Sequence, residues 1–178
     1  LGASLLGTHA MANSIDVNVS DDSIGADVEF SLNRENSLLL GAGVLYSEEY
    51  SRSSTIGNVS FQAAETKKNT YHASVGAKLY AYSDPGSNTG TALAFGGSFY
   101  HVIPTLERVS AGGSLFAAPS VTSFGKTKRL YDANARIAFR VIQNADVYLG
   151  YRQLKLKNNR GFNKALEKGF HLGVRASF

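Results

Sequence analysis

Apolar and polar residues alternate along most of the chain from Asn13 onward. In the segment 15–20 every second residue is aliphatic and the residues between are polar, and the pattern resumes over 24–32 after the pair Asp21 and Asp22. A period of two places successive side chains on opposite faces of an extended strand. These segments predict a β-hairpin, and helical periodicity is nearly absent from the chain.

The same alternation predicts about ten strands in all. Beyond the first hairpin, the expected strands cover Ser37–Ser47, Thr55–Glu65, Thr70–Tyr82, Thr91–Ile103, Arg108–Ala118, Arg129–Ile142, Ala145–Lys157 and Lys168–Phe178. Residues 13–178 allow roughly 17 residues for each strand with its connection, which suits strands that cross a membrane. We therefore expect an all-β fold, a closed antiparallel transmembrane β-barrel of about ten strands. Eight or twelve strands are the alternatives, because closure favours even numbers.

Short and long connections alternate along the chain after the first hairpin. The short ones read NREN, TKKN, PTLE and QN, and the long ones read EEYSRSS, SDPGSNTG, APSVTSFGKTK and NNRGFNKALE. Outer-membrane barrels have tight periplasmic turns and extended extracellular loops. The alternation favours this architecture, with both termini on the periplasmic side, and only the short connection at Asp21 and Asp22 departs from it.

The alternation alone fits two kinds of barrel, because the apolar face could line a ligand cavity or could meet lipid. Aromatic residues on this face lie toward the strand ends, where a girdle would meet lipid headgroups. They are Tyr46, Tyr71, Tyr131, Tyr151, Phe170 and Phe178. The rings and the length of the strands favour an outer wall in contact with lipid.

The last ten residues, GFHLGVRASF, alternate without a break and end on an aromatic ring. Barrel precursors commonly end on such a strand, and the assembly machinery of the outer membrane recognises the terminal aromatic. We therefore expect Phe178 to be the contact for barrel-assembly machinery.

Composition excludes several other classes of protein. The chain has 178 residues, 43% of them hydrophobic, a net charge of +4 and no cysteine. No run of about 18 apolar residues is present, which excludes a membrane-spanning helix. The mild and dispersed positive charge does not favour nucleic-acid binding, and the missing cysteines exclude disulfides and thiolate chemistry. Residues 1–12, LGASLLGTHAMA, are expected to be a signal-peptide remnant cleaved after Ala12, or a disordered arm.

The last third of the chain contains a series of short motifs. They are Gly150-Tyr151-Arg152, Asn159-Arg160, Asn163, Ala165-Leu166, Gly173-Val174 and Ala176-Ser177-Phe178. In these positions the chain resembles the YfaZ family of Gram-negative outer-membrane proteins. The Gly-rich segment Ala94–Pro104, which ends in a Pro turn, is similar to the family in the middle of the chain. The resemblance implies a barrel in the Gram-negative outer membrane with a porin-type role, and it bears on location more directly than on activity.

Charged residues on the polar face would line the lumen if that face points inward. The expected lumen-lining residues are Asp16, Glu29, Lys78, Arg136, Arg140, Arg152 and Arg175. Closure brings the first strand beside the last, so the two acids are expected within reach of Arg152 and Arg175, because an unpaired charge in a narrow lumen is costly. We therefore expect a small porin or channel with a charged lumen, in which exposed arginines would favour anions. A polar plug that only stabilises the barrel is the alternative.

Basic residues gather in the late connections. They are candidates for binding lipopolysaccharide, because basic side chains pair well with phosphate. The candidates are Lys126, Lys128, Arg129, Arg160 and Lys164, together with Lys155, Lys157 and Lys168 near the same expected rim. A solvated, charged loop is the alternative interpretation. These residues also raise a second function, a non-conducting surface barrel that binds lipopolysaccharide or a partner.

A barrel lipid hydrolase is the third alternative. His72 and Ser74 in YHAS share a face and resemble the His-x-Ser pair of barrel lipid deacylases, with Glu65 or Glu107 as a third member. The flanking residues of that motif are missing, and the expected register directs the pair into the lumen, away from acyl chains. We therefore expect no enzyme, no metal site among the scattered histidines and no cofactor, and a monomer is favoured.

Overall fold

The computed structural model describes residues 13–33, 35, 37–49, 52–67, 70–84, 88–125, 127–158 and 163–178. The expected signal-peptide remnant, residues 1–12, lies outside these described residues. The elements are β1 (Ser14–Val19), β2 (Ser23–Ser31), β3 (Leu38–Glu49), β4 (Arg52–Lys67), β5 (Tyr71–Asp84), β6 (Asn88–Val102), β7 (Val109–Ala118), the 3-10 turn η1 (Ser120–Thr122), β8 (Ser123–Gly125), β9 (Thr127–Ile142), β10 (Ala145–Asn158) and β11 (Asn163–Ser177).

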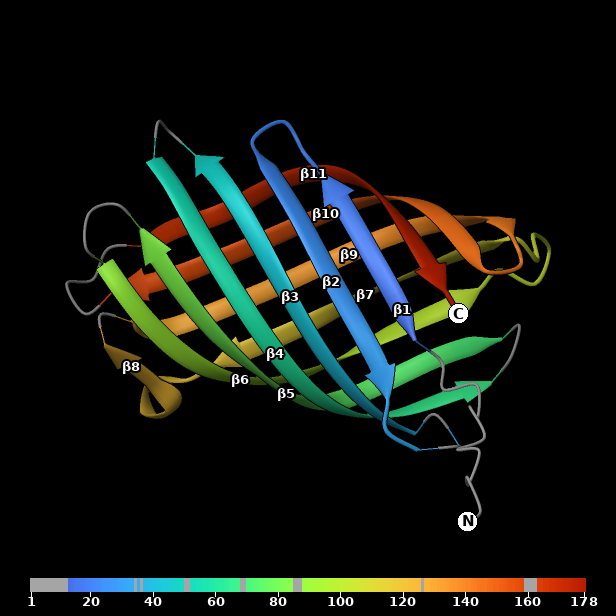
Figure 1. Cartoon of the computed structure of the whole chain (residues 1–178), viewed down its shortest axis with the longest axis horizontal. Helices are drawn as coiled ribbons and strands as arrows, with labels where there is room; N and C mark the ends of the chain where they lie inside the picture. Colours follow the sequence, from blue (N-terminus) through green and yellow to red (C-terminus); the bar gives the residue numbers. More distant parts are fainter. Residues whose placement is uncertain are drawn as a thin grey trace, which may run out of the picture.

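The strands form one closed antiparallel barrel (Figure 1). Their order around the ring is β5-β4-β3-β2-β1-β11-β10-β9-β7-β6, and the pairing of β6 with β5 closes it. Within the described residues, ten strands make up the ring, and the short β8 pairs with β6 beside it. The predicted closed antiparallel barrel of about ten strands is confirmed.

The strand β8 continues the path of β7 along β6. Ala117 of β7 pairs with Phe95, and further along β6 Ser123 of β8 pairs with Ala92. Pro119 and η1 interrupt this path, and proline cannot donate a backbone hydrogen bond to the ladder. The expected long connection APSVTSFGKTK is therefore largely an interrupted strand.

The seam of the barrel joins β1 to β11. Ile15 pairs with Ala176 and Asp16 with Arg175, so apolar residues share the outer face and charged residues the inner one. The pairing extends past both strands. The amide of Asn13 donates to the carbonyl of Phe178 at 3.1 Å, and the amide of Phe178 donates to the carbonyl of Asn13 at 2.9 Å. We call the end of the barrel with these residues the terminal end, and the opposite end, where β2 begins and β10 stops, the far end.

Several strands run further toward the far end than the alternation predicts. β3 continues to Glu49, β4 begins at Arg52, and β11 begins at Asn163 instead of the expected Lys168. Polar residues occupy both faces there, so the period of two stops, but the backbone ladder continues, with Glu48 still paired to Ser53. The predicted long connections were wrong in this respect, because most of their residues belong to strands.

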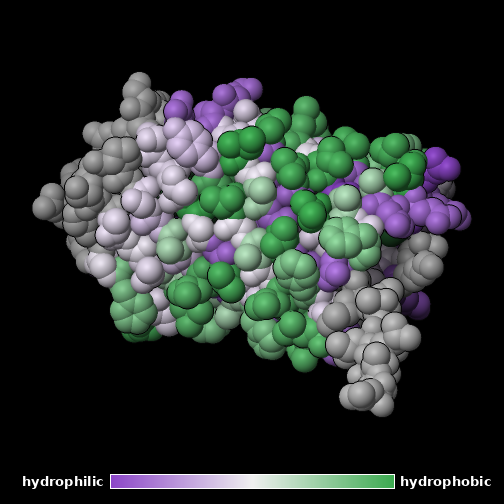
Figure 2. Space-filling view, in the orientation of Figure 1, coloured by the Kyte–Doolittle hydropathy of each residue, from purple (hydrophilic) through white to green (hydrophobic). Residues whose placement is uncertain are grey.

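The outer wall is apolar around the ring. Large hydrophobic side chains are exposed on it, among them Val17, Val44, Phe61, Val75, Phe95, Phe139, Leu149 and Leu172. Figure 2 shows apolar side chains across the middle of the face formed by β1 to β5. An exposed apolar surface this extensive is unfavourable in water and favourable in the hydrocarbon of a bilayer. None of the described residues belongs to a helix long and apolar enough to cross a membrane.

Candidate functional site

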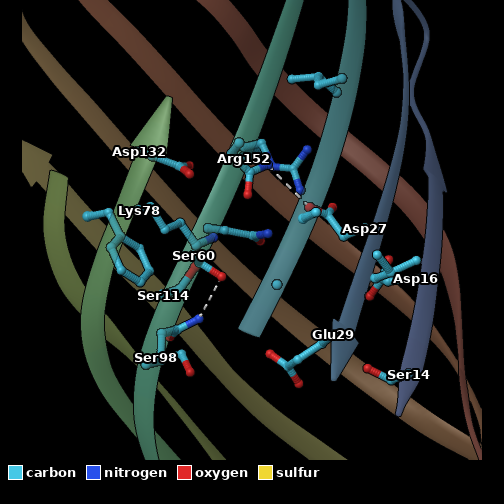
Figure 3. Close-up of a pocket in the computed structure, with 18 of the residues that line it drawn as sticks. Ser14, Asp16, Asp27, Glu29, Ser60, Lys78, Ser98, Ser114, Asp132 and Arg152 are labelled. Carbon is cyan, nitrogen blue, oxygen red and sulfur yellow. Dashed lines mark hydrogen bonds between the residues drawn. The ribbon is translucent and has the colours of Figure 1, made fainter. Parts of the chain in front are cut away.

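The inward faces of the strands enclose a polar cavity, which we call the polar chamber. It has a volume of about 150 Å³. Acidic and basic residues converge on it from opposite walls (Figure 3), with Asp16, Asp27 and Glu29 on the β1–β2 side and Lys78 and Asp132 across from them. Each projects inward because it occupies an alternate position of its strand.

Three arginines of the chamber are ion-paired. Arg136 lies 3.1 Å from Asp16, Arg152 lies 3.3 Å from Glu167, and Arg175 lies 2.8 Å from Glu29. These distances join a guanidinium nitrogen to a carboxylate oxygen in each pair. Pairing satisfies charges that would be costly in a narrow lumen, and it removes the free arginine surface that anion selectivity requires.

Asp16 and Arg136 form the centre of a packed cluster. The Asp16 carboxylate also accepts a hydrogen bond from the Tyr148 hydroxyl. Cζ of Arg136 lies 4.4 Å from the ring centroid of Tyr100 and 4.9 Å from that of Tyr148, so the guanidinium contacts two aromatic faces. Since β1, β6, β9 and β10 each contribute one of these residues, the cluster braces the barrel across its interior.

Further polar contacts hold the remaining charges. Nζ of Lys78 lies 4.6 Å from the ring centroid of Phe116, and the Tyr80 hydroxyl donates to Asp132 at 2.6 Å. Asp27 accepts a hydrogen bond from the Asn58 amide at 3.4 Å.

Uncharged hydrogen-bonding groups form a second part of the chamber wall. The Ser74 and Ser98 hydroxyls are 2.7 Å apart, and Ser74 donates to Gln62 at 2.8 Å. Gln62 donates in turn to Ser60 at 3.4 Å, and Ser114 lines the same chamber. This chain of hydroxyl and amide groups can bind small polar solutes through neutral hydrogen bonds.

An apolar cluster closes the chamber toward the far end, and we call it the apolar plug. Its buried side chains are Leu45, Ile56, Tyr80, Tyr82, Ala92, Ala94, Phe116, Ala118, Leu130, Leu154, Leu156 and Leu166. Leu45, Ile56 and Leu154 also line the chamber, so the plug borders the chamber on the side of the far end. The lumen therefore contains a polar chamber and, toward the far end, an apolar cluster. Polar side chains such as Ser47, Ser54 and Thr127 are also buried at that end.

A second space adjoins the chamber on the side of the terminal end. It has a volume of about 350 Å³, shares Arg136, Tyr148 and Arg175 with the chamber and extends to Thr70 and Gln143 in the turns of that end. The second space therefore lies between the charged cluster and the terminal end, whereas the plug lies between the cluster and the far end.

A β-bulge in β11 sends two consecutive side chains inward. The register with β10 shifts after Leu154, which pairs with Glu167, so that Lys155 pairs with Ala165. The extra residue, Leu166, joins the apolar plug, while Glu167 is 1% exposed and accepts from Arg152 and from the Ser23 hydroxyl at 2.9 Å. Bulges re-aim side chains in this way.

The structure brings most of the predicted lumen-lining residues together. Six of the seven line the chamber, namely Asp16, Glu29, Lys78, Arg136, Arg152 and Arg175. Arg140 instead lines the second space at the terminal end, where its Nε lies 3.8 Å from Oδ1 of Asp146. Glu29 contacts Arg175, as expected from the closure of the first strand beside the last. The partner of Asp16 is instead Arg136 on β9, and the partner of Arg152 is Glu167.

Sequence reasoning missed Glu167, the ion-pair partner of the chamber residue Arg152. It falls in the segment NNRGFNKALE, which the alternation assigned to a connection, and the bulge at Leu166 breaks the period of two beside it. In the sequence, Glu167 is a single acidic residue between a predicted connection and a strand. Its position there does not tell whether its side chain points into the lumen or out of it.

The predicted lipopolysaccharide-binding residues are only partly described. Lys128 and Arg129 are exposed at the far end of β9. Lys126, Arg160 and the side chain of Lys164 lie outside the described residues.

The proposed hydrolase pair has other partners. His72 Nδ1 lies 2.7 Å from the Thr66 hydroxyl, and Ser74 contacts Gln62 and Ser98. Glu65 accepts from the Tyr71 hydroxyl at 2.6 Å at an exposed site. The described hydrogen bonds include none between His72 and Ser74, so the geometry of a nucleophile and its base is not assembled there.

A family model described as YfaZ precursor matches residues 1–178 of the chain. No curated protein matches it. Among solved structures, the chain is similar to the outer membrane channel DcaP of Acinetobacter baumannii, with 11% identity and a TM-score of 0.47 over 99% of this chain and 55% of that one. The chain thus spans about half the length of DcaP.

Two further solved structures are similar to this chain. An anion-selective porin from Comamonas acidovorans is 10% identical with a TM-score of 0.39, over 88% of this chain and 49% of that one. OmpT, an outer membrane protein of Vibrio cholerae, is 9% identical with a TM-score of 0.31, over 99% of this chain and 100% of that one.

Proposed function

The chain belongs to the YfaZ family, and from its divided lumen we propose that it is a Gram-negative outer-membrane barrel that acts as a small channel held closed by the apolar plug. The exposed apolar wall supports a membrane location, because such a wall is stable in hydrocarbon. The polar chamber would admit small solutes from the terminal end, and the plug would interrupt their path.

The division of the lumen is the observation that carries this proposal. A uniformly polar interior would favour a water-filled pore, and a uniformly packed one would favour a purely structural barrel. Here a wet, charged chamber adjoins a cluster that contains Ile56, Phe116 and Leu154. Apolar constrictions of this kind gate channels by excluding water, and movement or loosening of the cluster would open the path.

The paired charges of the chamber also set the selectivity that we propose. Because three arginines each face a carboxylate, the chamber carries interleaved charges instead of a basic ring. The open state is therefore expected to discriminate weakly between small anions and cations, in place of the anion preference that the arginines alone would produce.

Planar-bilayer recording tests the proposal. The wild-type barrel should be almost silent, and Ile56→Ser combined with Leu154→Ser should produce discrete conductance steps by making the plug polar. Ser98→Ala alters the chamber wall without touching the plug, so this control should remain silent. Heat-modifiable gel mobility verifies that each variant is folded.

The outcomes separate this function from its main alternative. A non-conducting surface barrel would stay silent in both the plug variant and the wild type. Large, permanently open conductance in the wild type would contradict a closed channel just as directly.

A further inference from the structure

The outer wall of β9, β10 and β11 changes character toward the far end. Aliphatic residues come first, then aromatic ones, then basic ones. In this order the outward positions include Ile137, Tyr131 and Arg129 on β9, Leu149, Tyr151, Lys155 and Lys157 on β10, and Leu172, Phe170 and Lys168 on β11. The same sequence of layers describes a lipid, which has acyl chains, an interfacial region and a charged headgroup.

We call Arg129, Lys155, Lys157 and Lys168 the basic wall. Arg129 pairs directly with Lys157 across β9 and β10, and like charges in directly opposed positions destabilise a sheet. Lys155 is the next outward residue of β10 after Lys157 in the direction of the terminal end, and it pairs with Tyr131. Within the described part of the chain, no ion pair involves any of these four residues. The arrangement is therefore suited to an anion from outside the protein.

Among the side chains that the structure describes, the outward basic residues of the far end lie on β9, β10 and β11. At the far end of β3 to β6, outward side chains are polar or acidic, namely Glu48 on β3, Thr55 on β4, Ser83 on β5, and Thr89 and Thr91 on β6, and at the far end of β1 and β2 they are the apolar Val19 and Ile24. A general requirement for solubility at the rim would not concentrate the basic residues on three adjacent strands. A localised ligand accounts for the concentration.

Rings lie directly beneath the basic wall. Tyr151 and Phe170 contact each other edge to face, with centroids 5.1 Å apart, and Phe170 is one of the most exposed rings of the outer wall. Tyr131 pairs with Lys155 on the same face. A free anion gains nothing from these rings, whereas a lipid-borne phosphate places its acyl chains against them and against Leu149 and Leu172.

We propose that the basic wall binds the phosphate groups of lipopolysaccharide, with the acyl chains lying along the aromatic and aliphatic positions below. The inference depends on the outer-membrane location proposed above and is independent of whether the lumen conducts. All four residues were among the basic residues predicted from sequence, but the structure places them on the outer wall of three strands instead of in loops, beside rings and aliphatic side chains that acyl chains can contact.

Native mass spectrometry of the detergent-solubilised barrel tests the site with diphosphoryl lipid A as the probe. Lys155→Gln combined with Lys157→Gln should weaken binding about thirtyfold, from the attraction of two basic side chains to an anionic lipid. Lys67→Gln combined with Arg108→Gln removes the same charge from exposed positions at the terminal end and should bind as the wild type does. Lys155→Arg combined with Lys157→Arg should retain binding.

Two further arms distinguish the source of the phosphate. The wild type and the double Gln variant should bind lipid A stripped of phosphate with equal affinity. Inorganic phosphate alone should not compete with lipid A at equal concentration. Equal lipid A affinity in the wild type and the double Gln variant would overturn the proposal, as would full competition by inorganic phosphate. If the double variant does not fold, Lys155→Gln alone should weaken binding about fivefold, and unchanged affinity there would overturn it as well.

These outcomes are separate from those of the conductance experiment. Silence of the plug variant in a bilayer would contradict the channel and leave lipid A affinity unaffected. Loss of the lipid A result would leave conductance unaffected.

Discussion

The ring of Tyr148 on β10 lies over Gly173 of the neighbouring strand β11. A Cβ added at Gly173 would come within 2.3 Å of the ring carbon Cζ of Tyr148. The missing side chain at 173 therefore allows the tyrosine to lie across the lumen, where its hydroxyl donates to Asp16. Glycine is required here for close approach of a ring.

Substitution of Gly173 tests this relationship. Gly173→Ala should displace the ring, break its hydrogen bond to Asp16 and lower the free energy of unfolding by about 1–3 kcal/mol, as overpacking does elsewhere. The measurement is urea unfolding in detergent micelles, followed by the loss of heat-modifiable gel mobility.

Gly169 on the same strand provides the matched control. Nothing lies within 4 Å of a Cβ at Gly169, so Gly169→Ala should be neutral or slightly stabilising, because it only reduces the freedom of the unfolded chain. Equal destabilisation by the two alanines would show that the Tyr148 contact is unimportant.

Two ion pairs of the chamber should differ sharply in their contribution to stability. Glu167 is 1% exposed, so Arg152→Met leaves a buried, unpaired carboxylate and should cost about 3–5 kcal/mol. Replacing Glu167 by Met in the same chain should recover most of that cost. Additive losses in this double-mutant cycle, followed by urea unfolding, would contradict the assignment.

Arg175 and Glu29 form the comparison pair, because their side chains are 26% and 27% exposed at the wetter end of the lumen. Water solvates the remaining charge when one partner is removed, so Arg175→Met should cost only about 1 kcal/mol or less. A cost as large as that of Arg152→Met would contradict a water-filled chamber open toward the terminal end.

His171 should be replaceable by an apolar ring. The side chain is 1% exposed, and neither ring nitrogen has a hydrogen-bond partner within the described residues. His171→Phe keeps the edge contact with Tyr148, where the centroids are 5.8 Å apart, and removes two unsatisfied polar atoms. The free energy of unfolding should rise by about 1 kcal/mol. A clear loss in the same urea assay would show that the nitrogens are used.

The depth of a residue on the outer wall should set the cost of adding a charge. Leu149 lies among the aliphatic positions of β10, so Leu149→Arg should destabilise the folded barrel by about 2–4 kcal/mol in a lipid bilayer. Gln153 lies on the same face nearer the basic wall, and Gln153→Arg should cost about 0–1 kcal/mol. Folding titrations into lipid vesicles measure both, and similar costs at the two positions would contradict the lipid-facing orientation.

The sequence by itself determined the strands, their facing and the closed ring. In GFHLGVRASF the alternation places Phe170, Leu172 and Val174 on one face and His171 and Arg175 on the other, because successive side chains of a strand point to opposite faces. The aromatic residues and the strand length then favoured the apolar face as the outer one. The same local rule failed where both faces are polar, as at Glu48 and Ser53, because backbone pairing continues there without an amphipathic pattern.

Only the tertiary structure decided which inward residues meet. Facing does not specify height along the barrel or distance across the lumen, so the pairing of Asp16 with Arg136 and the gathering of Leu45, Ile56 and Leu154 into a plug could not be read from a period of two. The inward turn of both Leu166 and Glu167 depends on a register shift against β10. These contacts arise between strands far apart in the chain, and closure of the ring is what brings them within reach of each other.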